Sequence, residues 1–390
     1  MLNMQAVSEA ECGRTVSQWL DSHIAGLELA TLPEAPLIHA RDAAKILPDL
    51  DVWDVWPLQL SDGSVAKVAG GTIWMILSAP CHSDPGARHD VARTRMLYKV
   101  GEDWRDCGNL FPERLNPGTR EWSGAAHYDP QSSTVTAYFT AAGRQGDPSR
   151  QFEQRLFQTQ GYLDIKDGAP KAQNWSDPVE SVTNDGSLYV DLSVDQGRPG
   201  HIRGFRDPYW FCDPATGLRY LIFAGSLADA KSDYNGVVGI AIADAGNTFT
   251  LLPPLISGDG VVNEMERPHL VIHAGAYYLF WSSQSHVFAP GTPPAPTGLY
   301  GMVAPNLMGP YAPLNGTGLV ITNPASEPRQ AYCWQVLDTL EVISFVDHWG
   351  LEGRSTADDP ALNRAQFGGT IAPMLKIAID GHKTRLIGLA

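Results

Sequence analysis

Asp51-Val-Trp-Asp-Val-Trp-Pro57 is a short run of β-branched, aromatic and acidic residues, and Pro57 is expected to end the strand that it forms. Similar β-rich runs of four to seven residues recur along the chain with Gly, Pro, Asp and Asn between them: Thr72–Leu77, Thr134–Phe139, Arg219–Phe223, Val237–Ile242, Tyr277–Trp281 and Leu340–Phe345. The 38 glycines and 29 prolines match a fold with many tight turns. The pattern predicts an all-β sandwich, barrel or propeller. Because no long amphipathic helix follows, an α/β barrel is disfavoured.

The N-terminal part of the chain has a different hydrophobic pattern from the β-rich remainder. Residues 1–35 show weak helical periodicity, at Val16–Leu20 and Ile24–Leu29, and are expected to form short helices packed on the main domain. No linker long or polar enough to divide the remainder is visible. Residues 36–390 are therefore expected to form one all-β domain.

The composition limits the partners of the protein. The chain has 28 Lys and Arg against 43 Asp and Glu, a formal net charge of −15, and 43% apolar residues, which suffices for a sizeable core. Nucleic-acid binding requires clustered cationic side chains that neutralise phosphates, so a nucleic-acid partner is not expected. An acidic surface is compatible with a neutral small-molecule ligand.

The cysteines and the N-terminus carry little further signal. The five cysteines are odd in number and lack zinc-ligand spacing, so we expect free thiols or small core residues and no zinc site. No other metal and no cofactor are expected. No basic start followed by an apolar run is visible, and no apolar stretch is long enough for a membrane span. The expected location is the cytoplasm by default, or the exterior by a non-classical export route.

Asp54 is the first candidate for chemistry, because two tryptophans bracket its carboxylate. Tryptophan faces stack on the apolar faces of sugar rings, and a carboxylate beside them can attack an anomeric carbon. Taken alone, the motif is explained at least as well by a pair of core tryptophans with a turn aspartate.

Arg206-Asp207-Pro208 is the second candidate motif. The arginine can hold the carboxylate of Asp207 ionised and should lower its pKa, which suits hydrogen bonding to sugar hydroxyls better than proton transfer. A structural salt bridge before a turn proline is the alternative explanation.

Glu264-Met-Glu266-Arg-Pro-His269 is the third motif. On a strand, Glu264 and Glu266 point to the same face, and two neighbouring carboxylates can raise the pKa of one of them, as a general acid requires. A solvated, charged strand end is the alternative. Together the three motifs suggest glycoside hydrolysis by paired carboxylates.

In this order and at these distances, the motifs WDVWP, EWSG, FRDP and ERPH resemble glycoside hydrolase family 68, which holds levansucrases, inulosucrases and bacterial β-fructofuranosidases. The resemblance runs from roughly Pro36 to Leu389 and includes the non-catalytic stretches Leu251–Leu255, Gly309–Gly316 and Gly368–Pro373. It implies a five-bladed β-propeller with a deep, acidic central pocket, here with short N-terminal helices.

The resemblance also implies roles for individual residues. Asp54 would be the nucleophile, Asp207 the transition-state stabiliser and Glu266 the general acid/base. The implied substrate-binding residues, with Arg267 included beside the acid/base, are Trp53, Trp122, Ser123, Arg206, Glu264, Arg267, Gln284 and Tyr332.

The chain departs from the family at several positions. Ala224 stands where a buried glutamate is usual, Gln284 where polymer-forming relatives often carry Arg or His at the acceptor site, and Cys333-Trp334 where Ser-His is usual. Asn263 replaces the aspartate of calcium-binding relatives, so no structural calcium is expected.

The sequence therefore predicts a retaining β-fructofuranosidase that hydrolyses sucrose and transfers fructosyl units to sucrose, with sucrose and fructo-oligosaccharides as its small-molecule ligands. A levansucrase making long β-2,6-fructan is the alternative within the family, and Gln284 favours short products. A glycosidase acting on arabinan or xylan is disfavoured by the WDVWP and ERPH contexts. A non-catalytic sugar-binding propeller is the alternative of another class.

Overall fold

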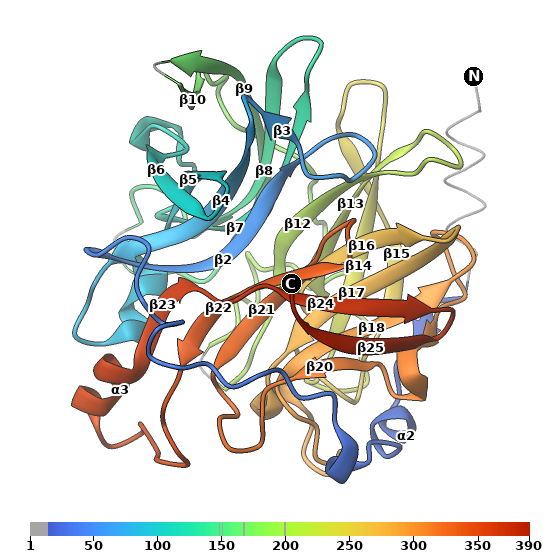
Figure 1. The fold of residues 1–390 in the computed structure, drawn as a ribbon. Coiled ribbons are helices and arrows are strands. Elements are labelled where there is room, and N and C mark those ends of the chain that lie inside the picture. Colours follow the sequence, from blue (N-terminus) through green and yellow to red (C-terminus); the bar gives the residue numbers. More distant parts are fainter. Residues whose placement is uncertain (1–14, 148, 150, 167, 199) are drawn as a thin grey trace.

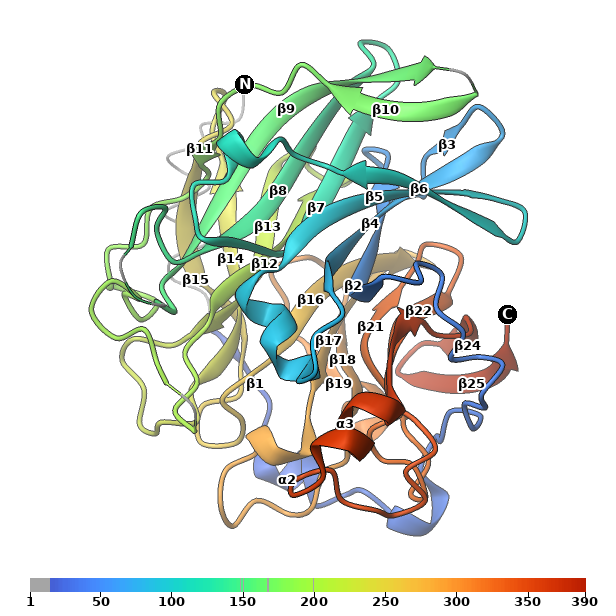
Figure 2. The ribbon, with the colours of Figure 1, turned by 90° about the vertical axis from the view of Figure 1, so that its left-hand side faces the viewer.

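The structure is a computed structural model that describes residues 15–147, 149, 151–166, 168–198 and 200–390. It is built almost wholly of β-strands, which confirms the all-β prediction (Figures 1 and 2). The described helices are short: α2 (Asp21–Ile24), α3 (Pro360–Gln366) and the 3₁₀ turns η1 (Leu29–Thr31), η2 (Pro85–Asp90), η3 (Glu113–Leu115), η4 (Ser285–Val287) and η5 (Leu314–Gly316). Among the described residues, no helix has the length and apolar character needed to cross a bilayer.

The strands fall into five consecutive antiparallel groups. The first two groups share one ten-stranded sheet, where β2 and β7 pair in parallel over two residues, and the other three form separate sheets. The first group is β2 (Leu50–Gln59), β3 (Lys67–Val68), β4 (Gly71–Pro80), β5 (Arg93–Val100) and β6 (Asp103–Asn109); the second is β7 (Arg120–Asp129), β8 (Thr134–Ala142), β9 (Gln154–Lys166), β10 (Ala169–Gln173) and β11 (Val179–Glu180).

The remaining groups follow in chain order. The third is β12 (Phe205–Cys212), β13 (Arg219–Ser226), β14 (Gly236–Ala243) and β15 (Phe249–Ser257), joined by β1 (Ser17–Gln18). The fourth is β16 (Glu266–His273), β17 (Ala276–Ser283), β18 (Gly298–Ala304), β19 (Ala312–Pro313) and β20 (Leu319–Thr322); the fifth is β21 (Ala331–Val336), β22 (Glu341–His348), β23 (Phe367–Ile371), β24 (Leu375–Asp380) and β25 (Lys383–Leu389).

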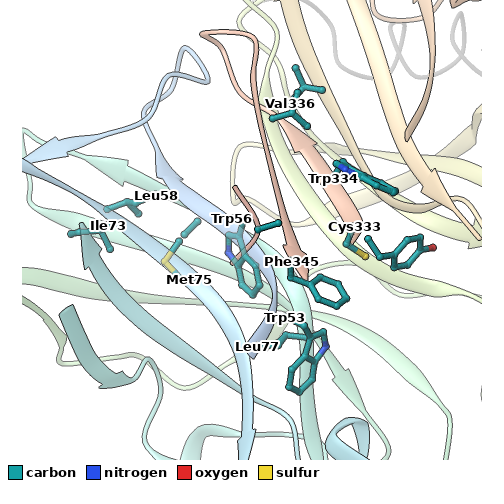
Figure 3. Packing of buried hydrophobic residues seen from close by; sticks show 14 of the residues in the cluster. Trp53, Trp56, Leu58, Ile73, Met75, Leu77, Cys333, Trp334, Val336 and Phe345 are labelled. Carbon is teal, nitrogen blue, oxygen red and sulfur yellow. The ribbon is translucent and has the colours of Figure 1, made fainter. Parts of the chain in front are cut away.

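The first strands of the five groups contact one another in a closed ring. Strand β7 contacts β2 and β12, β12 contacts β16, β16 contacts β21, and β21 and β22 return to β2, so that the last group packs against the first. Figure 3 shows part of this closing core, where Trp53, Trp56 and Leu58 of β2 lie among side chains of β4, β21 and β22. Residues distant in sequence are thereby brought to one place.

Each first strand also carries an irregularity of pairing at a corresponding position. The register shifts at Trp53/Val55 in β2, Trp122/Gly124 in β7, Arg206/Tyr209 in β12, Glu266/His269 in β16 and Tyr332/Gln335 in β21. At four of these positions the residue has a positive φ: Asp54, Asp207, Arg267 and Cys333. A β-bulge redirects a side chain and interrupts the ladder, which is a way to aim carboxylates out of a strand.

Two sequence predictions differ from the structure. Strand β2 continues through Pro57, which pairs with Trp74, to Gln59. A proline is tolerated in a strand where its missing N–H costs no ladder hydrogen bond. The segment before residue 36 does contain the short α2 and η1, but it also contributes β1, whose two residues are too few to show alternation.

Trp19 explains why this N-terminal segment adheres to the domain. Its ring is fully buried against Trp281 and Tyr300, at centroid distances of 5.2 and 5.0 Å, and its Nε1 donates to the carbonyl of Thr317 at 3.0 Å. Burial of a tryptophan side chain is worth several kcal/mol, on the order of 3–5 kcal/mol by the usual cost of its removal.

The cysteines behave as the sequence predicts where they are described. Cys81, Cys107, Cys212 and Cys333 are free thiols, and Cys12 lies outside the described residues.

Candidate active site

A cavity of about 340 Å³ opens where the first strands of the groups meet. It contains eight of the eleven residues that the sequence singles out: Trp53, Asp54, Trp122, Ser123, Arg206, Asp207, Glu264 and Glu266. These residues come from four different groups, and the positive φ of Asp54 and Asp207 accompanies their exit from the strand ladder. The three proposed catalytic carboxylates therefore share one site.

Asp54 is held by a hydroxyl from the neighbouring group. The Oγ of Ser123 donates to Oδ2 of Asp54 at 2.5 Å. Ser123 is buried, whereas Asp54 is only half-buried and faces the cavity. The thiol of Cys333 is a further hydrogen-bond partner of Asp54. These hydrogen bonds fix the orientation of the carboxylate toward the cavity.

Arg206 connects the other acidic residues. Its Nη2 donates to Oε1 of Glu264 and lies 3.3 Å from Oε1 of Glu266, and its Nε lies 3.7 Å from Oδ2 of Asp207. This confirms the expectation that Glu264 and Glu266 point to the same face. One buried guanidinium thus lies among three carboxylates, which reduces the cost of burying their charge.

The pKa of Asp207 moves in the opposite direction from the sequence prediction. Burial raises it to about 7, although Arg206 acts to lower it, while the nearby carboxylates of Glu266 and Asp54 raise it further. The carboxylate is enclosed, with its backbone N–H donating to Thr140 Oγ1 and its Oδ2 accepting from the N–H of Arg267. The burial of the carboxyl group raises its pKa more than the charge of Arg206 lowers it. The sequence prediction missed this result because no motif reveals how deeply Asp207 is buried.

Glu266 has a raised pKa, as the sequence predicts, but for another reason. Burial is the main cause, followed among the raising effects by the charge of Asp54, whereas Arg206 and the hydroxyl of Tyr332 act to lower it. Tyr332 donates its hydroxyl proton to Oε2 of Glu266. A carboxyl group whose pKa is raised by burial can be protonated near neutral pH and act as a general acid.

The two cavity tryptophans are held rigidly. Trp53 is 1% exposed and packs edge-on against His89 at 5.5 Å, with the guanidinium of Arg88 over its ring. Trp122 donates its Nε1 to the carbonyl of His89 at 3.3 Å. Both rings can form apolar walls for a sugar without rearranging.

Arg267 does not line this cavity, in contrast to the sequence prediction. Its guanidinium lies below the site, where it donates to the carbonyl of Val55 at 3.2 Å and to Oε1 of Gln335 at 3.1 Å, and it lies over the ring of Trp56. The bulge after Glu266 turns consecutive side chains in different directions. Arg267 therefore connects β16 to β2 and β21 through these contacts and does not contact the cavity.

Gln284 and Tyr332 line a second cavity, of about 220 Å³, beside the first. Gly86 lies on both, and the hydroxyl of Tyr332 reaches Glu266 from the second cavity. Arg88, Arg329, Asp347 and His348 add charged groups to its wall.

Several cavity residues are absent from the sequence prediction. Gly86 and His89 come from η2, Phe152 and Gln154 from the second group, and Gln196, Arg198, His201, Ile202 and Arg203 from the segment before β12. The last segment is anchored by Arg203, which donates to Asp195 at 2.8 Å and to Asp233 at 3.0 Å. Apart from Gln154, which begins β9, these residues lie in connections with no periodicity, so the sequence offers no signal that they close the site.

Asn263 is buried next to this site, and its Oδ1 has no hydrogen-bond partner. Within the described parts of the chain, no group of three or more His, Cys, Asp or Glu side chains could hold a metal ion. The residues present therefore do not fit a carboxylate-rich calcium site.

Glu121, in the EWSG motif, is a buried acid behind the site. It is 2% exposed, its Oε2 accepts from the N–H of Thr94 at 2.7 Å, and burial raises its pKa to about 7. Because the folded pKa lies above the ordinary 4.5 of glutamate, the folded state holds a proton that the unfolded state releases between these values. The contribution of Glu121 to the free energy of unfolding should fall as the pH rises from about 4.5 to 7, and this contribution should stay level outside that window.

We expect Glu121→Gln to remove most of this component, which amounts to about 3 kcal/mol when the shift is converted at 1.36 kcal/mol per pKa unit. Urea unfolding at pH 4.5 and pH 7.5 measures it, with the exposed Glu102→Gln as a matched control. Asp207, whose pKa is also raised to about 7, should keep a residual slope of the same sign. An unchanged difference between the two pH values in Glu121→Gln would contradict the assignment.

Comparisons with known proteins identify the family of this chain. A family model described as levansucrase/invertase matches residues 13–236 and 229–387. The levansucrase of Zymomonas mobilis subsp. mobilis is 32% identical over 93% of this chain and 90% of its own length. The structure of the inulosucrase from Halalkalicoccus jeotgali bound to kestose covers 96% of both chains with a TM-score of 0.88 and 36% identity. The levansucrase structure from Bacillus subtilis, at 22% identity and a TM-score of 0.79 over 97% of this chain and 96% of that one, shares the fold.

Proposed function

Because the chain belongs to glycoside hydrolase family 68, the levansucrase and invertase family, we propose that it cleaves sucrose through a covalent fructosyl-enzyme. Family membership makes it a sucrose-acting glycoside hydrolase or fructosyltransferase. The observation that carries the mechanism is the convergence of Asp54, Asp207 and Glu266 on one cavity, where Arg206 lies between Asp207 and Glu266. In the proposal Asp54 is the nucleophile, Glu266 the general acid/base and Asp207 the transition-state stabiliser.

In the first step, a carboxylate oxygen of Asp54 attacks C2 of the fructosyl unit while Glu266 gives its proton to the departing glucosyl oxygen. Burial raises the pKa of Glu266, which favours the protonated carboxyl group that this step requires. In the second step, the Glu266 carboxylate takes a proton from water or from a sugar hydroxyl, which then attacks C2 and releases Asp54. Water as acceptor gives hydrolysis, and a sugar gives transfer.

The charge of the site suits the proposed transition state. A fructosyl oxocarbenium ion is cationic, and the carboxylates of Asp54, Asp207 and Glu264 face the cavity in which it would form. Trp53 and Trp122 would form the apolar walls of the fructosyl subsite, and the hydroxyl of Ser123 would keep Asp54 oriented toward C2.

We also propose that the five antiparallel groups are the blades of a five-bladed propeller. The contacts between successive first strands, and the return from the fifth group to β2, support this arrangement. The bulge near the same point of each first strand would then be the device by which every blade presents residues to the central axis.

The reaction is tested by incubating the protein with sucrose and quantifying glucose, fructose and oligosaccharides over time. Equal amounts of glucose and fructose would identify a hydrolase. An excess of glucose, with the missing fructose in short oligosaccharides or in polymer, would identify fructosyl transfer and its product length. Release of neither sugar would refute the proposal, and retained sugar binding without turnover would favour a sugar-binding module.

The second cavity is the proposed acceptor side. The Halalkalicoccus jeotgali relative is bound to kestose, and we propose that this chain also accepts fructo-oligosaccharides. Gln284 lines this cavity together with Tyr332, the hydrogen-bond donor to Glu266, so an acceptor bound there would lie next to the acid/base.

We therefore expect Gln284→Arg or Gln284→His to raise the ratio of transfer to hydrolysis several-fold, because a cationic or aromatic donor holds an acceptor sugar more firmly than the amide. The ratio of oligosaccharide-bound to free fructose at equal sucrose consumption measures it. Gln284→Glu, which keeps the size but cannot donate, is the matched control. An unchanged product profile in Arg, His and Glu variants would remove Gln284 from the acceptor site.

A further inference from the structure

Lys45 and Cys81 form a contact outside both cavities that the proposed reaction does not use. The Nζ of Lys45 lies 3.1 Å from the Sγ of Cys81. Cys81 is exposed, and the side chain of Lys45 retains 24% of its exposure, so small solutes can reach both groups. A lysine nitrogen thus donates a hydrogen bond to a cysteine sulfur on the surface.

The pair is held in this position by neighbouring groups. Lys45 Nζ also donates to Oδ1 of Asp51 at 2.5 Å and to the carbonyl of Leu50 at 3.1 Å, while the N–H of Cys81 donates to the carbonyl of Asp49. Asp51 is fully buried and receives two further hydrogen bonds from Arg364, at 2.6 and 3.0 Å. The Sγ of Cys81 also lies 3.7 Å from the same Oδ1 of Asp51. The nitrogen and the sulfur are therefore held beside one carboxylate oxygen, and such fixed proximity favours an intramolecular reaction between them.

The other described cysteines have different surroundings. The sulfur atoms of Cys107 and Cys212 contact the backbone carbonyls of Arg105 and Gly217, each at 3.9 Å, and Cys333 is buried in the core. Cys81 thus combines exposure with a lysine amine in contact. This combination is independent of the carbohydrate chemistry.

We propose that Lys45 and Cys81 are an oxidative cross-linking site, in which peroxide joins Nζ to Sγ by a direct nitrogen–sulfur bond. Hydrogen peroxide first oxidises the thiol by two electrons: Cys–SH and H₂O₂ give Cys–SOH and H₂O. Lys45 then releases one proton to solvent, and its amine attacks the sulfenic sulfur. The N–S bond forms as the S–O bond breaks, and the hydroxide leaves with an amine proton as water. In sum, thiol, ammonium and one peroxide give the cross-link, two waters and one proton.

The cross-link would act on the wall of the active site through the backbone. Cys81 directly precedes the connection that carries η2, whose Gly86 and His89 line the main cavity. A covalent tie to Lys45 fixes the start of this connection to the segment before β2. Asp51 would lose one cationic partner but keep its two hydrogen bonds to Arg364, so the fold should tolerate the change.

The test treats the intact protein with hydrogen peroxide and follows peptides by mass spectrometry before and after dithiothreitol. We expect a peptide pair joined through Lys45 and Cys81 with the mass of the two peptides less two hydrogens, reversed by the reductant. The modified protein should also unfold at a higher temperature, because the cross-link restricts the unfolded chain. This readout needs no activity, so its failure leaves the proposed function untouched.

Lys45→Arg keeps the charge beside Asp51 but removes the nucleophilic amine, and should give no cross-link while Cys81 still reacts with a sulfenic-acid probe. Cys81→Ser should give neither, and Cys107→Ser should behave as the wild type. Cys81 that ends only as sulfinic acid or as an intermolecular disulfide would overturn the proposal. A bridge that retains an oxygen between nitrogen and sulfur would overturn the direct bond.

Discussion

Asp54→Asn should lower sucrose turnover by at least about 10⁴-fold while leaving the fold intact, since loss of a catalytic nucleophile costs this much in enzymes of comparable design. The amide has nearly the shape of the carboxylate, and its oxygen can still accept the hydrogen bond of Ser123. It lacks the negative charge and the nucleophilic oxygen needed to form an ester with C2. Binding of sucrose should therefore change far less than turnover.

The measurement is glucose release from sucrose, accompanied by sucrose binding by calorimetry and by thermal unfolding. The exposed Asp49→Asn makes the same chemical change shortly before β2 and should be neutral. Asp54→Ala excludes any activity regained by deamidation of the asparagine. Turnover near the wild-type rate in both Asp54 variants would show that another group is the nucleophile.

Much of this site could be predicted from the sequence because each essential carboxylate lies in a short motif on the first strand of a group. Asp54, Asp207 and Glu266 stand beside Trp, Arg and Pro residues that mark these strand ends. The corresponding position in the first strand of the fifth group is Cys333, which also has a positive φ but is not an acid. The sequence therefore does not show that this strand shares the irregularity of the others. Only the strand pairing reveals that the irregularity is common to all five.

The features that the sequence does not predict depend on how deeply a side chain is buried and on the direction in which it points. Alternation along a regular strand directs Arg267 away from Glu264 and Glu266, and its guanidinium does lie outside the cavity, but its contacts with Val55 and Gln335 come from groups that the sequence does not identify. The raised pKa of Asp207 follows from burial that outweighs its adjacent arginine. His89 and Arg198 reach the cavity from connections whose path is set by tertiary packing.

Glu266→Gln should lower sucrose cleavage by about 10³-fold or more, because the amide can neither protonate the departing glucosyl oxygen nor activate an acceptor. The glutamine side chain has nearly the same size and should be buried in the same way, but its amide has no acidic proton like that of the Glu266 carboxyl group, whose pKa burial raises. A donor such as β-fructofuranosyl fluoride, whose leaving group needs no protonation, should still form the ester with Asp54. The first step would then survive with this donor, and the fructosyl-enzyme should accumulate since no base activates water.

Azide distinguishes this role from a merely structural one, because it attacks C2 without a base. With the fluoride donor, azide should restore turnover of Glu266→Gln and yield a fructosyl azide, whereas Asp54→Asn should not respond because it forms no ester. The exposed Glu102→Gln should match the wild type throughout. Equal losses with sucrose and the fluoride, without rescue by azide, would mean that Glu266 supports the site through its contacts with Arg206 and Tyr332 instead of transferring the proton.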